Sequence, residues 1–84
     1  MSNNIYVGNL PWSYRDDELK GLFDEHGDVT SAKVIVDRMS GRSRGFGFVE
    51  MASGDEAASA IETLNGFEVE GRELKVNEAK PRDD

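Results

Sequence analysis

The sequence predicts an α+β domain in which two helices cover one face of a four-stranded antiparallel sheet. Four segments alternate apolar and polar residues, as half-buried strands do, and two segments carry apolar residues at helical spacing. Along the chain these segments follow one another in the order βαββαβ. The 84 residues suit a single domain with one modest core. With both helices on one face, the other face of the sheet is expected to be open.

The first strand is predicted at about residues 4–10, because NIYVGNL is rich in β-forming residues and Pro11 follows it. The first helix is predicted at residues 16–26, where two leucines and a phenylalanine recur at helical spacing among charges and Gly27 provides a stop. Serine and aspartate are good capping types, and three residues could precede its first turn: Ser13, Arg15 and Asp16.

The second strand is predicted at residues 29–37 (VTSAKVIVD) and the third at residues 45–51 (GFGFVEM). The polar sequence RMSGRSR lies between them, so we expect an antiparallel pair with a long connection. The second helix is predicted within residues 53–66, where apolar residues recur at helical spacing and Asn65-Gly66 ends the pattern.

The last strand is predicted at residues 73–79, after a short hairpin with Glu70-Gly71 at its turn. We therefore expect one domain over residues 1–84, with a folded core at about residues 4–79 and a polar tail at residues 80–84. The element order is that of the split βαβ, or ferredoxin-like, sandwich.

The alternation of side chains assigns each strand residue to a face of the sheet. In the third strand Phe46, Phe48 and Glu50 share one face, and a carboxylate is rarely buried, so this face is predicted to be open. Extended to the other strands, the pattern predicts that the residues packed against the helices are Ile5, Val7, Ala32, Val34, Val36, Val49, Met51, Leu74 and Val76. The residues predicted on the open face are Tyr6, Lys33, Ile35, Phe46, Phe48, Glu50, Lys75 and Asn77.

Three glycines in the strands are given roles by the same assignment. Gly45 and Gly47 fall on the helix side, where small residues allow close packing. Gly8 falls on the open side, where it is predicted to leave room for a base beside Tyr6.

Three aromatic rings interleaved with lysines on an open sheet are suited to single-stranded nucleic acid, either RNA or DNA. Bases stack on aromatic rings, while lysine and arginine neutralise backbone phosphates. The alternative from the residues alone is that the rings only stabilise the sheet by cross-strand contacts. Exposed aromatic patches on small monomers usually mark a binding surface, which favours the first interpretation.

The net charge of −7 argues at first against a nucleic-acid partner. The charge is segregated, however. Residues 15–28 hold six acids and residues 50–73 hold seven, whereas residues 33–48 hold one lysine and three arginines against Asp37. The basic segment therefore includes the strand that carries two of the rings.

The motifs on the first and third strands resemble those of the RNA-recognition motif family. RGFGFVEM at residues 44–51 matches the family octamer K/R-G-F/Y-G/A-F-V-x-F/Y at seven of eight positions, and IYVGNL at residues 5–10 is similar to its hexamer. The resemblance spans residues 4–80, and the compact chain resembles the small single-motif RNA-binding proteins of bacteria and plastids. The one departure is Met51, which parity places on the core side.

The resemblance implies that single-stranded RNA is the partner and that bases stack on Tyr6 and Phe48. It also implies that Phe46 packs against sugars and that Arg44 pairs with a phosphate. The further residues expected to contact RNA, less closely tied to the motifs, are Lys33, Ile35, Arg42, Lys75, Asn77 and Lys80.

Two other functions compete with RNA binding as interpretations of the sequence. A peptide-binding variant of the fold would use the acidic segment RDDELKGLFDEHGD, although such acids more simply form a solvated helix face. An enzyme on the same architecture has little support, because the chain has no cysteine and His26 is its sole histidine, with no partner at metal-ligand spacing. We therefore expect no catalytic residue, metal or cofactor.

The compartment and the oligomeric state are less constrained by the residues. No segment approaches the roughly 20 apolar residues of a membrane span, and the first residues do not resemble a secretory signal. The expectation is a monomeric cytoplasmic protein, with the nucleus or an organelle left open.

Overall fold

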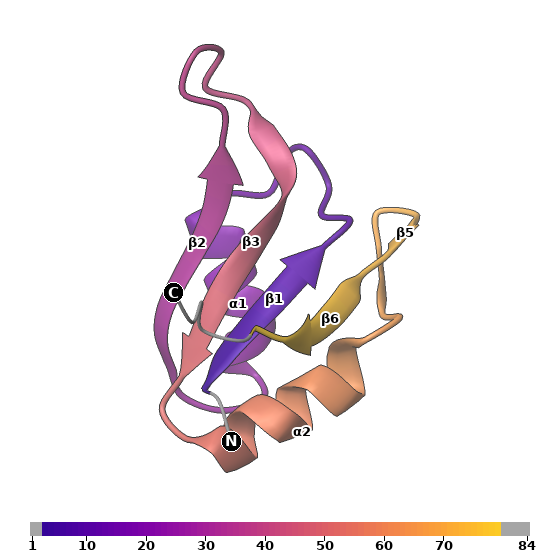
Figure 1. Cartoon of the computed structure of the whole chain (residues 1–84). Helices are drawn as coiled ribbons and strands as arrows, with labels where there is room; N and C mark the ends of the chain where they lie inside the picture. The colour runs from indigo at the N-terminus through magenta and orange to yellow at the C-terminus, as the bar shows by residue number, and fades with distance from the viewer. Residues whose placement is uncertain (1–2, 80–84) are drawn as a thin grey trace.

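A computed structural model describes residues 3–79 and confirms the predicted fold class. Four strands form one antiparallel sheet in the order β2-β3-β1-β6 (Figure 1). The bounds of these strands are β1 Asn4–Gly8, β2 Val29–Val36, β3 Ser43–Met51 and β6 Lys75–Glu78. The two motif-bearing strands, β1 and β3, are therefore neighbours at the centre of the sheet.

Two helices, α1 (Asp16–Asp24) and α2 (Gly54–Leu64), pack on one face of the sheet. Figure 1 looks onto the opposite face, with α1 behind the strands and α2 crossing the lower end. The buried apolar residues form one cluster between the layers: Ile5, Val7, Leu10, Leu19, Phe23, Val34, Val49, Met51, Ala57, Ala60, Leu64, Leu74 and Val76. Met51 is among them, as parity predicted, and Ala32 packs against the cluster from its edge.

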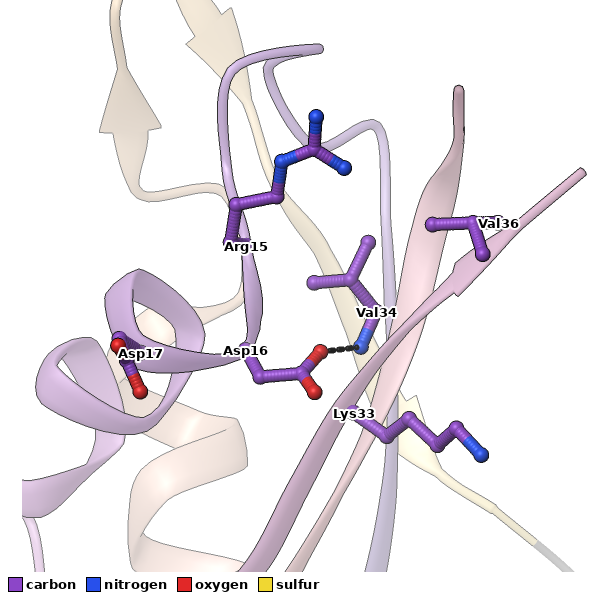
Figure 2. Close-up of a pocket in the computed structure, with 6 residues that line it drawn as sticks. All are labelled: Arg15, Asp16, Asp17, Lys33, Val34 and Val36. Atoms are coloured by element: carbon purple, nitrogen blue, oxygen red, sulfur yellow. Dashed lines mark hydrogen bonds between the residues drawn. The ribbon is translucent and has the colours of Figure 1, made fainter. Parts of the chain in front are cut away.

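The prediction that Val36 is a core residue was wrong, because 43% of its surface is exposed. The carboxylate of Asp16, at the start of α1, accepts a hydrogen bond of 2.7 Å from the backbone N–H of Val34. Val36 lies two residues farther along β2, beyond the start of the helix, where Figure 2 shows it across a hollow from Arg15. Alternation assigned its side correctly, but the helix does not extend far enough to cover it.

The ends of the elements differ from the sequence prediction by a few residues. β1 ends at Gly8 because Asn9 adopts a left-handed conformation, with φ of 60°. β3 begins two residues earlier than predicted, since Ser43 pairs with Val36. Of the three candidates, Arg15 is the N-cap of α1, and its backbone N–H donates to the Glu18 carboxylate at 2.6 Å.

The predicted hairpin near the C-terminus is present as two short strands, β4 (Glu68–Val69) and β5 (Arg72–Glu73). Glu70 and Gly71, at its turn, both have positive φ values of 50° and 81°. Two such residues in succession form the type I′ turn that matches the twist of paired strands. The hairpin stands beside the end of β1, next to the open face (Figure 1).

Candidate nucleic-acid interface

The register of the sheet places six of the eight predicted open-face residues in two rows. The first row crosses all four strands, with Lys33 opposite Phe48, Phe48 opposite Tyr6, and Tyr6 opposite Asn77. The second row joins Phe46, Gly8 and Lys75. We call the rings of Tyr6, Phe46 and Phe48 the aromatic platform.

The three rings of the aromatic platform contact one another. The ring centroids of Tyr6 and Phe46 are 6.0 Å apart, those of Tyr6 and Phe48 5.9 Å, and those of Phe46 and Phe48 6.1 Å. Contacts at these separations stabilise the sheet by about 0.5–1.5 kcal/mol per pair, so the cross-strand role is real. These contacts leave part of each ring accessible, because 41% of Phe48 is exposed and the other two rings are half-buried. The platform can stabilise the sheet and still accept a planar ligand.

The prediction that Gly8 leaves room for a base beside Tyr6 was wrong. A Cβ atom on Gly8 would lie 2.6 Å from the hydroxyl oxygen of Tyr6 and 2.9 Å from a carbon of its ring. Gly8 therefore makes room for the Tyr6 ring itself, which lies over the backbone, and not for a base beside that ring. The glycine fixes where the platform presents its first ring.

The glycines of β3 have two different roles. A Cβ atom on Gly47 would lie 2.5 Å from the Lys33 carbonyl oxygen and 3.0 Å from Leu19, which bears out the predicted close packing against α1. The packing role expected of Gly45 was wrong, since a Cβ atom there would meet only the Leu10 carbonyl oxygen, at 3.9 Å. Gly45 instead has φ of 84° and lies at an irregularity in the β2–β3 pairing. Between the pairs Val34–Gly47 and Val36–Ser43, the chain advances four residues along β3 but only two along β2. That conformation favours glycine.

Basic side chains border the platform on two sides. Arg44 and Lys75 line a hollow of about 490 Å³ together with Tyr6 and Phe46. Lys33 lines a second hollow of about 290 Å³ with Ile35 and Phe48. Among residues 3–79, no carboxylate lies within salt-bridge distance of Lys33, Arg44 or Lys75, and the ion pair found there joins Lys20 and Asp24 on α1. These cations are therefore available to phosphates.

One of the predicted residues lies away from the platform. Arg42 is exposed and lines a different hollow, with Trp12 and Arg15, beyond the end of the sheet. Lys80 lies outside the described residues. Glu50 is on the open face as predicted, where it lines the same hollow as Lys33. The end of the platform near Glu50, toward the C-terminus of β3, is thus less favourable to phosphate than the end near Arg44.

The connection between β2 and β3 projects beyond the sheet as a compact loop (Figure 1). The Asp37 carboxylate accepts hydrogen bonds from the backbone N–H groups of Met39, at 2.7 Å, and Ser40, at 3.3 Å. These bonds lower the pKa of Asp37, and the positive charge of Arg44 adds to the effect. The Asp37 carbonyl oxygen also accepts from the Gly41 N–H at 2.7 Å. The loop therefore has a defined conformation beside the basic side of the platform.

Sequence reasoning did not include Trp12, Asn9 and Arg72 in the site, although all three line the hollow that holds Arg44 and Lys75. Arg72 comes from the β4–β5 hairpin, about sixty residues away in the sequence. The only feature of the sequence that pointed to this part of the site was the tryptophan that follows the first strand.

Two other features are absent from the described part of the chain. Within residues 3–79 there is no group of three or more histidine, cysteine, aspartate or glutamate residues that could hold a metal ion. In that same part of the chain, no helix has the length and apolar character needed to cross a membrane.

Comparison with known proteins assigns the chain to a family. The model of the RNA recognition motif family matches residues 5–75. The chain is 54% identical over 82 residues to the 31 kDa chloroplastic ribonucleoprotein of Nicotiana sylvestris, and 51% identical over 80 residues to the 29 kDa chloroplastic ribonucleoprotein of Arabidopsis thaliana. The two alignments cover 98% and 95% of this chain, but only 26% and 23% of those proteins. The chain thus spans about a quarter of the length of these relatives.

Solved structures give the same result. The crystal structure of RNA binding protein PG1 matches with a TM-score of 0.91 and 54% identity, over 99% of this chain and 100% of that one. The Rna15 RRM with bound RNA (GU) matches with a TM-score of 0.88 and 30% identity, over 100% of this chain and 89% of that one. The octamer and the hexamer lie side by side on β3 and β1, and the family model matches from β1 through both helices to the first residue of β6. The chain belongs to the RNA recognition motif family.

Proposed function

We propose that this chain binds single-stranded RNA on the open face of its sheet. The observation that carries the proposal is the aromatic platform, three contacting rings that no helix covers. Arg44, Lys33 and Lys75 border it and have no ion-pair partner among residues 3–79. A solved relative that contains RNA, the Rna15 RRM, supports the proposal, since its motif has the same fold as this chain. Residues 4–79 would act as the binding unit.

Each part of the platform has a distinct role in this proposal. Bases stack on Tyr6 and Phe48, Phe46 packs against sugars, and Arg44 pairs with a phosphate. Lys33, Ile35, Lys75 and Asn77 contact the flanking nucleotides, and Arg42 and Lys80 add positive charge. Each stacked base contributes about 1–3 kcal/mol, and ordering the strand offsets part of this. Two to four bound nucleotides then give an affinity on the order of micromolar or weaker, with modest sequence selectivity.

The test is the double variant Phe46→Ala, Phe48→Ala, measured with short single-stranded RNA by fluorescence anisotropy. Both side chains lie on the open face, so the variant should fold, as circular dichroism would verify, and lose detectable binding. Phe67→Ala is a matched control, because Phe67 is 47% exposed but lies between α2 and β4. A folded double variant that keeps the affinity of the wild type would overturn the proposal.

Salt dependence tests the phosphate contacts separately from stacking. With three or four phosphates neutralised, the logarithm of the association constant should fall with the logarithm of salt concentration at a slope of about −2 to −3. A slope near zero would show that Arg44 and the lysines do not contact phosphates. Single-stranded DNA of the same sequence should bind only slightly more weakly, because stacking does not depend on the 2′-hydroxyl group.

The two other functions are less well supported. The acidic residues of α1 are exposed and form an ordinary solvated helix face, while a peptide-binding variant would not need three rings on the open sheet. The named relatives are ribonucleoproteins, which supports a binding protein in place of an enzyme. Their names also place those proteins in chloroplasts, so they favour the organellar alternative over the cytoplasm expected from the sequence. A monomer is proposed, and sedimentation of the purified chain would test it.

A further inference from the structure

Beyond the end of β1, a second group of side chains extends the aromatic platform. The guanidinium carbon of Arg72 lies 5.9 Å from the centroid of the Trp12 ring, a cation–π contact. Arg72 also donates a hydrogen bond of 3.2 Å to the side-chain oxygen of Asn9. The side-chain nitrogen of Asn9 donates in turn to the Glu73 carbonyl oxygen at 2.8 Å. We call Trp12, Arg72 and Asn9 the Trp12 group.

The Trp12 group is continuous with the platform. One hollow of about 490 Å³ is lined by all three of its members and by Tyr6 and Phe46 of the platform. Arg44 and Lys75 line the same hollow, which gives it three cations, and none of its lining side chains is a carboxylate. In a chain with a net charge of −7, this concentration of positive charge makes the hollow a favourable place for a phosphate.

The Trp12 group is built before any ligand arrives. Asn9 is in the left-handed region with φ of 60°, and its two side-chain hydrogen bonds hold the hairpin against the start of the β1–α1 loop. Ser13 adds a contact of 3.4 Å to the Glu70 carboxylate at the hairpin turn. Figure 1 shows the loop and the hairpin side by side at the end of β1. A preformed site loses less conformational entropy when it binds.

A purely structural role would be for Trp12 to anchor the hairpin. The ring is poorly suited to that role alone, because 60% of Trp12 remains exposed even with Arg72 beside it. An exposed tryptophan with an adjacent guanidinium is instead the combination that stacks a base and holds its phosphate. At the other end of the platform, Glu50 makes the surface less favourable to phosphate.

We propose that the Trp12 group binds one further nucleotide of the RNA strand that lies on the platform. The base stacks on the exposed ring of Trp12, and the phosphate that links it to the platform pairs with Arg72. This inference rests on the proposed RNA binding and extends its site from the sheet to the loop and the hairpin.

The test compares RNA lengths in the wild type and in Trp12→Ala. Randomised single-stranded RNA pools of three and six nucleotides would be titrated against each protein by anisotropy. The wild type should gain about five- to tenfold more affinity than Trp12→Ala on going from three to six nucleotides, while the two proteins bind three nucleotides alike. The number of possible binding registers changes equally for both proteins and so cancels. Phe67→Ala should behave as the wild type does.

Two further measurements keep the test decisive. Trp12 is the only tryptophan, so intrinsic fluorescence reports on it directly and should be quenched by six nucleotides but not by three. Arg72→Gln should make the salt slope shallower by about 0.7, the effect of one lost phosphate contact on a single strand. If Trp12→Ala fails to fold, Trp12→Phe and Arg72→Gln carry the test, with the ring largely retained in the first and the charge lost in the second.

The outcomes separate this inference from the proposed function. A wild type that binds neither RNA pool overturns both. A wild type that binds RNA while Trp12→Ala shows the same gain with length, with no quenching and an unchanged slope in Arg72→Gln, overturns the Trp12 group alone.

Discussion

Gly47 and Gly8 lie in adjacent strands and face opposite sides of one sheet, and both are crowded. A Cβ atom would lie 2.5 Å from its nearest neighbour at Gly47 and 2.6 Å at Gly8. The neighbours differ in kind: at Gly47 it is the backbone carbonyl of Lys33, and at Gly8 it is the end of the Tyr6 side chain. The covered face is thus constrained by backbone packing, whereas the open face is constrained by where its rings can lie. Stability and binding should therefore respond to different substitutions.

The largest effect is expected for Gly47→Ala. The new methyl group would meet a backbone carbonyl that cannot move without disturbing the β2–β3 pairing, and it would also press on Leu19. Overpacking of this kind costs about 1–3 kcal/mol in the free energy of unfolding, measured by urea denaturation. RNA affinity of the folded protein should change little, because the methyl group points to α1.

Gly21→Ala is the matched control for that substitution. Gly21 lies within α1, and a Cβ atom there meets nothing within 4 Å. Alanine should stabilise the helix by about 0.5–1 kcal/mol. Equal unfolding free energies for Gly47→Ala and Gly21→Ala would contradict the crowding that distinguishes the covered face.

A smaller effect, and on binding in place of stability, is expected for Gly8→Ala. The methyl group would push the Tyr6 ring off its position, which disturbs one of the stacking surfaces without touching the core. Affinity for a short RNA should fall by about fivefold, on the order of 1 kcal/mol, a part of the value of one stacked base. The free energy of unfolding should stay close to that of the wild type, since a ring end can rotate and alanine is favoured over glycine in a strand.

The binding measurement on Gly8→Ala needs its own reference. Tyr6→Ala removes the ring entirely and should weaken binding more than Gly8→Ala does. If Gly8→Ala instead lowers the unfolding free energy as much as Gly47→Ala does, the two faces do not differ in the proposed way.

These glycines also show how far sequence could predict the molecule. Alternation along β3 was sufficient to place Phe46 and Phe48 on one face of the sheet and Val49 and Met51 on the other, because side chains of a strand alternate between the two faces. At Val36 it gave the correct side but the wrong burial, since the pattern of one strand does not reveal where a helix in another layer begins. It also gave the wrong role to Gly45, whose positive φ follows from uneven pairing between β2 and β3.

The extension of the site beyond the sheet was less predictable still. Trp12 and Arg72 are about sixty residues apart, and their contact depends on a hairpin packing beside a loop. The charge of Arg72 stood in a segment of the sequence dominated by acids, so composition pointed away from it. Local patterns describe strands and their faces, while contacts between connections require the assembled fold.

The smallest effect concerns the β2–β3 loop at low pH. Hydrogen bonds from the Met39 and Ser40 N–H groups lower the pKa of Asp37 below its ordinary value of 3.8, and Arg44 assists. Because the pKa is lower in the folded loop, ionised Asp37 supports the loop at all pH values above about 3.8, and this support is lost as the pH falls through the lower folded value. NMR shifts of the Met39 and Ser40 amides should therefore titrate with a midpoint below pH 3.8 as the pH is lowered from 7. In Asp37→Asn the same amides should show no such transition, whereas a midpoint above 3.8 in the wild type would mean that the carboxylate does not hold the loop that lies beside the basic side of the platform.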